Sequence, residues 1–466
     1  MADGQHHHHG DGTAGGGRVP PGDGEGPAAE PGVRRSTRWK VARWAALGLS
    51  VVVLLTAGAG AFVFFRLNGN LRDMPLFGGV RGDAGSERPD AFGRTPLNVL
   101  VIGSDARSAP EDCRLGGDCG PGRNADVEMV LHIAADRSHA TVLSIPRDTV
   151  TRLPACRIPT GGIAPARRGP VNATLQYGPG CTVAAVHALT ALPIDHFVMV
   201  DFAGVVRMSN AVGGVPVCVD RDVYDPYAHL RLAAGRHELK GEGALAFLRS
   251  RHAFGDGSDL GRTDAQHLFL GALAHRMRVG GGFSDPSAML SLADAATKAL
   301  TVDTGLASVP KLTGLTADVR KVPSARFTFT TMPSRPDPRA PERLVPAPAA
   351  KDLFAAIAAD RPVRATGSGG PPADPGQARP EAGPAAAGPP ADETFEDETT
   401  APRPPTPAPA PSPGRPATAP AARVLDAAHG GACAKVATIA SVTVRGAAMT
   451  PTAAFAATPQ IPVSAR

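Results

Sequence analysis

LNVLVIG, at residues 97–103, is the first of three short apolar runs that define the predicted fold. VEMVLHIA follows at 127–134 and ATVLSI at 140–145, and turn-forming residues bound each run. Short runs rich in Val, Ile and Leu between turn residues are typical of buried strands. The three runs therefore predict neighbouring strands of one sheet.

Further elements are expected outward from these runs. Strands are predicted at 215–219 and 326–332, and helices at 182–192, 202–212, 242–250, 262–279, 285–300 and 350–360. Strands that alternate with helices predict an α/β domain in which helices cover a central sheet.

Charged side chains lie next to each of the first three predicted strands. They are Asp105 and Arg107 after the first, Arg123 and Asp126 before the second, and Arg147 and Asp148 after the third. A single Arg–Asp pair is usually a surface ion pair of little energetic consequence. Three such pairs at strand ends predict a binding site, because ligands of open α/β sheets bind outside the strand ends.

A second cluster of arginines lies in AFLRSRHAFGDGSDLGRTDAQ, residues 246–266. Arg249 and Arg251 are two residues apart, so an extended backbone would direct both to one face. Arg262 and Gln266 are four apart, so a helix would align them. Guanidinium groups bind phosphate well. The alternative is an exposed helix end whose charges are solvated.

Phosphoryl transfer is the chemistry that would use all of these groups. Asp105 and Asp126 are predicted to bind Mg²⁺. The phosphate oxygens would be bound by Arg107, Arg123, Arg147, Arg249, Arg251 and Arg262. Asp259 would either accept the proton of an attacking hydroxyl or orient Arg262.

Composition limits the classes of partner. The net charge of +5 is small for 466 residues, only 5% of residues are aromatic, and no basic run contains interleaved aromatics. No nucleic-acid partner is therefore expected. The 47 Pro and 54 Gly concentrate towards the two ends. We predict a disordered tail at 1–43, a tether at 66–95, one domain at 96–362 and a stiff linker at 363–423. Residues 424–466 contain few large apolar side chains and stay unassigned.

Residues 44–65, WAALGLSVVVLLTAGAGAFVFF, carry no charge and are long enough to span a bilayer. Five basic residues precede them between 34 and 43, so the positive-inside rule predicts a cytoplasmic N-terminus and an extracellular domain. A cleaved signal peptide is the alternative, but the apolar run is too long. A single-pass protein of the cell membrane is expected.

The six cysteines fit an oxidising compartment. Cys113 is expected to pair with Cys119, and Cys156 with Cys181, because each pair brackets a short loop or loop-like region. Cys218 lies in an apolar strand and is expected to be buried and free. Neither CxxC spacing nor clustered histidines supports a zinc site.

Six motifs in order resemble the LytR-CpsA-Psr family of cell-envelope proteins over about 96–300. They are NVLVIGSDAR, RNADVEMVLHI, SIPRDT, DFAGVVRMSNAVGGVPV, GEGALAFLRSRH and DLGRTDAQ. The resemblance implies a central mixed sheet with a hydrophobic lipid channel between sheet and helices. It also implies a ligase that moves a wall glycopolymer from a polyprenyl-pyrophosphate carrier to peptidoglycan.

The family's site residues fall on positions already selected here. By motif match, the magnesium carboxylates are Asp105 and Asp126, and the pyrophosphate-binding residues are Arg123, Arg147, Arg249, Arg251, Arg262 and Gln266. The family commonly reads Arg-[Ser/Thr]-Asp-Thr at the second motif. Here one extra residue separates Arg123 from Asp126, which would let Arg123 point differently.

Three other functions are weighed against the ligase. A polyprenyl-pyrophosphate hydrolase would use the same site with water as acceptor. A non-catalytic lipid-binding protein would need the channel more than the carboxylates. A transcriptional attenuator is disfavoured, because the motifs lie outside the cell and include no basic DNA-reading helix.

Overall fold

The computed structural model describes residues 34–107, 110–116, 119–120, 122–279, 285–365, 418–419 and 433–464. The chain divides into two compact units, Met1–Val63 and Phe64–Arg466. Helix α1 (Arg34–Asn70) begins in the first unit, and its residues Arg38–Asn70 are apolar and long enough to cross a membrane. The predicted span at 44–65 lies within it. The predictions for 1–33 and for nearly all of the linker fall outside the described residues.

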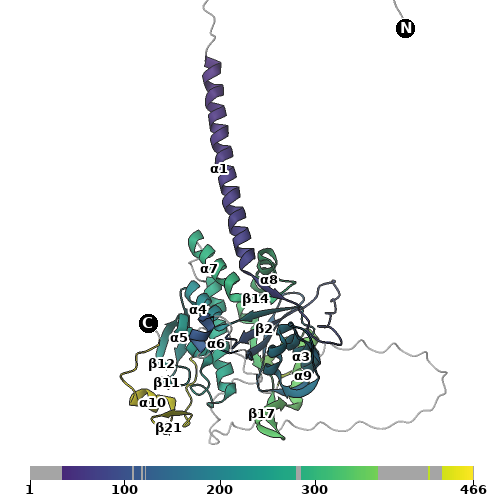
Figure 1. Cartoon of the computed structure of the whole chain (residues 1–466), viewed down its shortest axis with the longest axis vertical. Coiled ribbons are helices and arrows are strands. Elements are labelled where there is room, and N and C mark those ends of the chain that lie inside the picture. Colours follow the sequence, from purple (N-terminus) through teal and green to yellow (C-terminus); the bar gives the residue numbers. More distant parts are fainter. Residues whose placement is uncertain are drawn as a thin grey trace, which may run out of the picture. The chain divides into compact units, whose positions relative to one another are not determined.

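A mixed seven-stranded sheet forms the centre of the second unit (Figure 1). Its strands in spatial order are β1 (Arg72–Met74), β14 (Leu300–Asp303), β9 (His196–Val200), β2 (Leu97–Ser104), β3 (Ala125–Ile133), β4 (Ala140–Ile145) and β15 (Phe327–Thr331). β2, β3 and β4 pair antiparallel, whereas β9 is parallel to β2 and β15 is parallel to β4. The predicted central sheet and its first three strands are confirmed.

Helices α2 to α9 follow the predicted pattern with two additions. They are α2 (Pro110–Gly116), α3 (Pro179–Thr190), α4 (Phe202–Ala211), α5 (Gly241–Arg249), α6 (Asp259–Val279), α7 (Pro286–Ala299), α8 (Val309–Lys321) and α9 (Pro348–Ala358), with a 3-10 turn η1 (Val171–Tyr177). α2 and α8 were not predicted. α4 begins at Asp201, whose Oδ1 accepts a hydrogen bond from the backbone N–H of Gly204 at 2.7 Å. An aspartate at this position satisfies an otherwise unpaired amide of the first turn.

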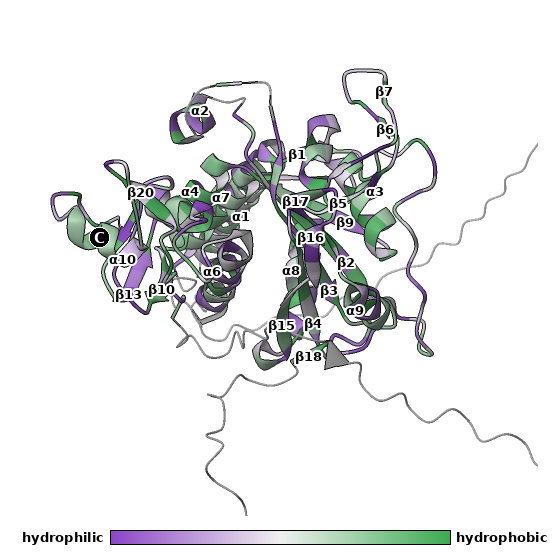
Figure 2. Ribbon diagram, turned by 90° about the horizontal axis from the view of Figure 1, so that it is seen from below, coloured by the Kyte–Doolittle hydropathy of each residue, from purple (hydrophilic) through white to green (hydrophobic). Residues whose placement is uncertain are grey.

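Alternate side chains of β2, β3 and β4 face opposite sides of the sheet. Leu100 and Leu143 belong to the large core that includes residues of α3 and α9. Met129 belongs to a smaller core on the other face, against which Leu270 of α6 packs. Figure 2 shows α6 and α9 on opposite sides of these strands. Because successive side chains of a strand point to opposite faces of the sheet, each continuous apolar run contributes side chains to both faces.

A second core lies beside the main sheet. It is built on β10 (Val215–Val219) paired with β13 (Gly235–Leu239), and on β11 (Val223–Asp225) paired with β12 (Leu230–Leu232). The C-terminal segment adds β20 (Val442–Val444), β21 (Ala447–Met449) and α10 (Pro451–Ala457), and Ala434 and Val436 enter this core. Figure 1 shows the segment, in yellow, beside β11 and β12. Residues 433–464 are therefore an integral part of the domain, which the sequence did not predict.

Four further short strand pairs complete the structure. They are β5 (Val150–Leu153) with β8 (Arg167–Pro170), β6 (Cys156–Arg157) with β7 (Ile163–Ala164), β16 (Ser334–Asp337) with β17 (Ala340–Pro346), and β18 (Arg364–Ala365) with β19 (Thr418–Ala419). The predicted tether at 66–95 is wrong in part. β1 pairs with β14, and the backbone N–H of Gly78 donates to the carbonyl of Gly180 at 2.9 Å.

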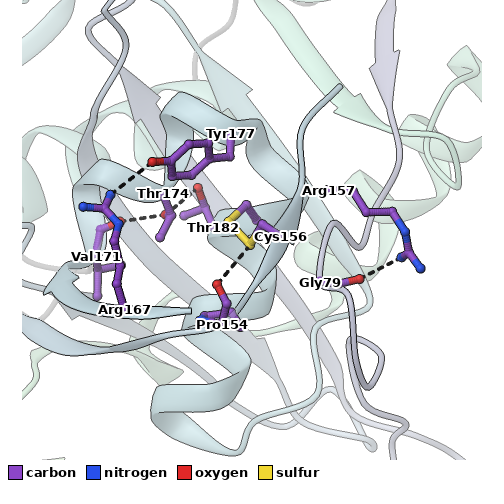
Figure 3. Close-up of a disulfide and its surroundings, with 10 residues drawn as sticks. Gly79, Pro154, Cys156, Arg157, Arg167, Val171, Thr174, Tyr177 and Thr182 are labelled. Atoms are coloured by element: carbon purple, nitrogen blue, oxygen red, sulfur yellow. Dashed lines mark hydrogen bonds between the residues drawn. A yellow bond between two sulfur atoms is a disulfide. The ribbon is translucent and has the colours of Figure 1, made fainter. Parts of the chain in front are cut away.

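All six cysteines form disulfides. Cys113 pairs with Cys119 and Cys156 with Cys181, as expected. The second bond joins β6 to the first turn of α3, close to a hydrogen bond of 3.0 Å between Thr174 and Thr182 (Figure 3).

The prediction that Cys218 is a free thiol is wrong, because it is bonded to Cys433. The backbone explains the pairing. Ala434 forms a bridge with Val219, and its N–H donates to the carbonyl of Cys218 at 2.8 Å. The two cysteines are thereby brought together although 215 positions separate them in the sequence.

Candidate functional site

A cavity of about 650 Å³ is lined by the central sheet and by α4, α5 and α6. Most of its lining is apolar and includes Val101, Met129, Val198, Val205, Phe269 and Leu273. Cavities of this size with mostly apolar linings and a few convergent polar groups are typical ligand sites.

Charged groups gather at one end of the cavity, where β2 ends and β3 begins. They are Asp105, Arg107, Asp126, Arg147, Arg249, Arg251 and Arg262, and the neutral amide of Gln266 lines the cavity with them. Strand register explains why Asp105, Asp126 and Arg147 come together. Ser104 lies opposite Ala125, and Glu128 lies opposite Ile145, so the end of β2, the start of β3 and the end of β4 meet. The structure thus brings together eight of the ten predicted site residues.

Asp126 is at the centre of the arginine cluster. Its Oδ1 contacts a guanidinium nitrogen of Arg147 and lies 3.7 Å from Nη2 of Arg251. Nη2 of Arg262 donates to the backbone carbonyl of Asp126 at 3.3 Å. The Asp126 carboxylate thus orients two guanidinium groups and its backbone carbonyl a third, and arginine side chains held in this way are preorganised for a further anion.

Asp105 has a different set of partners. Its carboxylate accepts hydrogen bonds from the backbone N–H of Asn124 and, at 3.2 Å, from Nδ2 of the same residue. The Asp105 backbone N–H donates in turn to the carbonyl of Asn124 at 3.1 Å. These bonds fix the segment that leads into β3, and so they also fix the position of Asp126.

Arg249 ends α5 and lines the same part of the cavity. Its Nη1 donates to the carbonyl of Leu115 at 3.0 Å, and its guanidinium lies 4.7 Å from the centroid of the Phe202 ring. Burial lowers the pKa of Arg249, and the neighbouring cations Arg107 and Arg251 lower it further. The guanidinium remains charged, because the ordinary arginine pKa is very high. A bound polyanion would relieve the mutual repulsion of these cations.

Helix α6 contributes two buried polar groups to this end. Arg262 is 3% exposed and Gln266 is 5% exposed. Nε2 of Gln266 donates to the carbonyl of Leu248 at 3.1 Å, which links α6 to α5. The predicted alignment of Arg262 and Gln266 on one helix face is confirmed. Asp259 is the first residue of α6, but its side chain lies outside the described part of the structure, so its role stays a prediction.

Arg123 is the predicted site residue that the structure places elsewhere. It lines a smaller neighbouring hollow of about 300 Å³, which shares Ser104 and Asp201 with the cavity. The extra residue between Arg123 and Asp126 provides the physical reason, because successive side chains near a strand alternate in direction. Arg123 is therefore not part of the main arginine cluster.

Three residues of the cavity were missed from the sequence. Asp225 is fully buried and accepts a hydrogen bond of 2.6 Å from the hydroxyl of Ser250. Nδ1 of His252 lies 4.0 Å from Oδ2 of Asp225, and the His252 ring is 4.7 Å from that of Tyr227. His252 follows Arg251 directly, which was the available signal. The sequence contained no such signal for Asp225, because only the fold brings β11 next to the segment that contains Arg249 and Arg251.

The donor set of this end fits magnesium. Mg²⁺ is usually bound through one or two carboxylates together with substrate phosphates. Asp105 and Asp126 both line the cavity, and the surrounding arginines would hold the phosphates. These two residues would therefore hold the ion.

The cavity thus combines an apolar lining with a cluster of arginines at one end. Residues 83–344 match the LytR_cpsA_psr family. The match covers more than half of the 466 residues, and the chain belongs to the LytR-CpsA-Psr family.

The chain is also similar to proteins of the cell envelope. The chain is 29% identical over 311 residues to the cell wall biosynthesis protein LcpA of Corynebacterium glutamicum, which covers 61% of this chain but only 58% of LcpA. It is 27% identical over 256 residues to the polyisoprenyl-teichoic acid–peptidoglycan teichoic acid transferase TagT of Bacillus subtilis, covering 53% of this chain and 74% of TagT. A solved LytR-Csp2A-Psr enzyme from Actinomyces oris is 23% identical, covers 62% of this chain and 95% of its own, and superimposes with a TM-score of 0.47.

Proposed function

We propose that this protein transfers a cell-wall glycopolymer from a polyprenyl-pyrophosphate carrier to peptidoglycan. The observation that carries the proposal is the apolar cavity that leads directly to a cluster of arginines. A polyprenyl pyrophosphate has the same two parts, a long hydrocarbon chain and a compact polyanion. The transferase names of relatives such as TagT support the same reaction class.

The proposed step breaks the phosphoanhydride bond of the pyrophosphate and forms a new phosphate ester. A peptidoglycan hydroxyl attacks the phosphorus atom that carries the sugar. The bond from that phosphorus to the bridging oxygen breaks, and polyprenyl monophosphate leaves with the bridging oxygen. The product is a sugar–phosphate–peptidoglycan diester, and the hydroxyl proton passes to a base.

The arginines would provide most of the catalysis. Charge on the phosphate oxygens and the leaving oxygen must be stabilised in the transition state, and preorganised guanidinium groups do this at fixed positions. Arg251 lies at the centre of this role, because Asp126 orients it and Arg249 lies nearby. Magnesium bound by Asp105 and Asp126 would add further neutralisation of the pyrophosphate charge.

His252 is the described residue best placed to accept the hydroxyl proton. Its side chain lines the cavity, is 37% exposed, and has the buried Asp225 carboxylate behind it. A carboxylate on one side of an imidazole stabilises the imidazolium that forms when the other side takes a proton. Asp259 is the alternative base.

The same proposal includes the location of the protein. Three disulfides favour an oxidising compartment, and basic residues precede the apolar part of α1. We therefore place the N-terminus in the cytoplasm and the second unit outside, where both the membrane-bound carrier and peptidoglycan are available.

A reconstituted reaction tests the function. The full chain in detergent is incubated with a polyprenyl-pyrophosphate-linked glycan, Mg²⁺ and peptidoglycan oligomers, and the products are identified by mass spectrometry. A glycan–phosphate–peptidoglycan adduct is expected. Polyprenyl monophosphate with free glycan phosphate would instead indicate a hydrolase, and intact bound lipid would indicate a binding protein.

Matched arginine variants connect the activity to the cavity. Arg251→Ala should lower adduct formation by about a hundredfold, the usual effect of removing one charge-stabilising donor. Arg152→Ala is the control, because Arg152 is an exposed residue of β5 away from the cavity. An equal loss of adduct formation in both variants would show that the transfer does not depend on the cavity.

A further inference from the structure

A group of histidine and acidic side chains lies at the opposite end of the central sheet from the arginine cluster. His132 is near the end of β3, His139 lies just before β4, and Asp360 follows α9. β2 runs antiparallel to β3, and Asn98 near its start lies opposite His132. Asn98 and Ser104 are six residues apart on β2, which is about 20 Å along a strand. This group is therefore separate from the cavity.

The ligand atoms of His132, His139 and Asp360 converge. One nitrogen of each ring and one carboxylate oxygen lie within 4.8 Å of one another. Nε2 of His132 is 3.0 Å from Oδ1 of Asp360. Their surroundings are shielded from solvent, since His132 is 2% exposed and His139 is 9% exposed.

His139 has a nitrogen without a partner. Its Nδ1 lies 3.1 Å from the hydroxyl of Ser138, whereas Nε2 makes no hydrogen bond among the described residues. A buried polar atom in this state is costly and needs an explanation. Because His139 belongs to the same group as His132 and Asp360, a bound ion would explain its unpartnered nitrogen.

His132 is held as metal-binding histidines usually are. Its Nδ1 lies 2.8 Å from Oδ1 of Asn98, and Nδ2 of Asn98 donates to the carboxylate of Glu87. In metal sites the second ring nitrogen typically donates to a carbonyl or carboxylate, which leaves Nε2 for the metal. The present contact between Nε2 of His132 and Oδ1 of Asp360 requires a proton between the two atoms. A cation bound between them would replace that proton.

The charge of the surroundings also favours a cation. Glu87, Asp195 and Asp360 are close enough to interact, and burial followed by the charges of Asp195 and Asp360 raises the pKa of Glu87 to about 7. A divalent cation would neutralise part of this excess negative charge.

We propose that His132 Nε2, His139 Nε2 and the Asp360 carboxylate bind a Zn²⁺ ion. Two imidazoles and one carboxylate are a typical zinc donor set, whereas Mg²⁺ prefers oxygen donors alone. Zinc–ligand distances near 2.1 Å in a tetrahedral site require the ligand atoms to lie about 3.4 Å apart. The present separations of up to 4.8 Å approach this value, so small side-chain rotations complete the site.

The expected role of the ion is structural. Asp360 has a left-handed backbone conformation, with φ of 52°, and its Oδ2 accepts a hydrogen bond of 3.0 Å from the N–H of Ala135. Zinc would therefore fasten the end of α9 to the turn between β3 and β4. Two ligands 228 positions apart in the sequence would be joined.

Zinc binding to the full chain in detergent tests the proposal. The parent protein has His6, His7, His8 and His9 replaced by alanine, because this run would bind zinc independently. Isothermal titration and metal analysis after dialysis should both give one Zn²⁺ per chain. Zn²⁺ should raise the melting temperature, and it should do so equally when Mg²⁺ is already present in excess.

Single variants locate the ion. In the parent background, His139→Ala should weaken zinc binding at least about a hundredfold and abolish the melting shift. Asp360→Asn provides a second variant that retains a hydrogen-bond acceptor for Ala135, should His139→Ala fail to fold. His275→Ala is the matched control, because His275 is an exposed residue of α6 and its removal should leave zinc binding unchanged.

Two results would overturn the proposal. One is the lack of stoichiometric zinc binding by the parent protein. The other is undiminished zinc binding in folded His139→Ala or Asp360→Asn protein. Neither result depends on transferase activity, so the zinc site and the proposed function are tested separately.

Discussion

Mild acidification is expected to weaken the packing of α6 on the sheet through one histidine. His267 is 2% exposed, its Nε2 lies 2.6 Å from the hydroxyl of Ser144 on β4, and its ring is 5.4 Å from that of Phe329. Burial lowers the pKa of His267 from the ordinary 6.5 to about 4. The folded protein therefore keeps the ring neutral over a range of pH in which the unfolded chain is protonated.

The sign and size of the effect follow from these two values. Since protons bind to the unfolded state first, the stability contributed by neutral His267 is complete above pH 6.5 and is lost as the pH falls towards 4. Each pKa unit corresponds to about 1.4 kcal/mol, so the loss reaches about 2 kcal/mol at pH 5 and about 3 kcal/mol at pH 4.

The assay compares the native protein with His267→Gln, whose amide can still bond to Ser144. Urea unfolding is followed by circular dichroism, because both tryptophans, Trp39 and Trp44, lie in α1 and do not report on the sheet. The free energy of unfolding is measured near pH 7.5 and near pH 5. The native protein should lose about 2 kcal/mol more than the variant between these conditions.

The comparison with the variant is necessary because Glu87 acts in the opposite sense. Its pKa is raised to about 7, chiefly by burial, so its contribution to stability increases as the pH falls from 7 to 4.5. This contribution is common to both proteins and cancels in the difference. A difference in unfolding free energy that stays constant between the two pH values would refute the reasoning about His267.

Three further predictions concern the cavity, the metal carboxylate and the C-terminal segment. Leu270→Trp should fill the apolar part of the cavity and lower turnover of the lipid-linked substrate at least about tenfold. Leu290→Trp, on the exposed side of α7, is the control and should leave turnover unchanged. Equal turnover in both variants would contradict the cavity assignment. Asp105→Asn should make any remaining transfer independent of Mg²⁺, and activity that still follows the Mg²⁺ concentration would place the ion elsewhere. Cys433→Ser removes a disulfide between residues 215 positions apart, which loop entropy predicts to contribute about 5 kcal/mol to stability. Limited proteolysis should therefore release the C-terminal segment sooner from the variant than from the native protein. The same cleavage pattern in both proteins would show that packing alone retains the segment.

The central sheet was predictable because its signal is local. β2, β3 and β4 are apolar runs between turn residues, and the charged residues at their ends follow from the same boundaries. Asp105, Asp126 and Arg147 could therefore be assigned to one edge before any contact was known. The orientation of Arg123 could not, because one inserted residue changes the face on which a side chain lies.

Other features depend on contacts between distant parts of the chain. The group of His132, His139 and Asp360 has no metal-binding spacing in the sequence, since the third residue lies more than 200 positions after the others. Asp225 became part of the cavity only because β11 lies beside the segment after α5. Sequence patterns identify single elements, whereas such groups are created by the way the elements pack.

The C-terminal segment shows how far this dependence extends into the site. Its few large apolar residues suggested no core, and it has none of its own. Instead, Val436 forms a bridge with Phe254, the N–H of Ala437 donates to the carbonyl of Ala253 at 2.8 Å, and the hydroxyl of Ser441 donates to the carbonyl of His252 at 2.7 Å. These bonds fix the backbone immediately after Arg251, the residue on which the proposed transfer depends most. A segment whose sequence alone predicts no structure therefore supports the backbone next to the arginine cluster, and the disulfide between Cys218 and Cys433 keeps this segment in place.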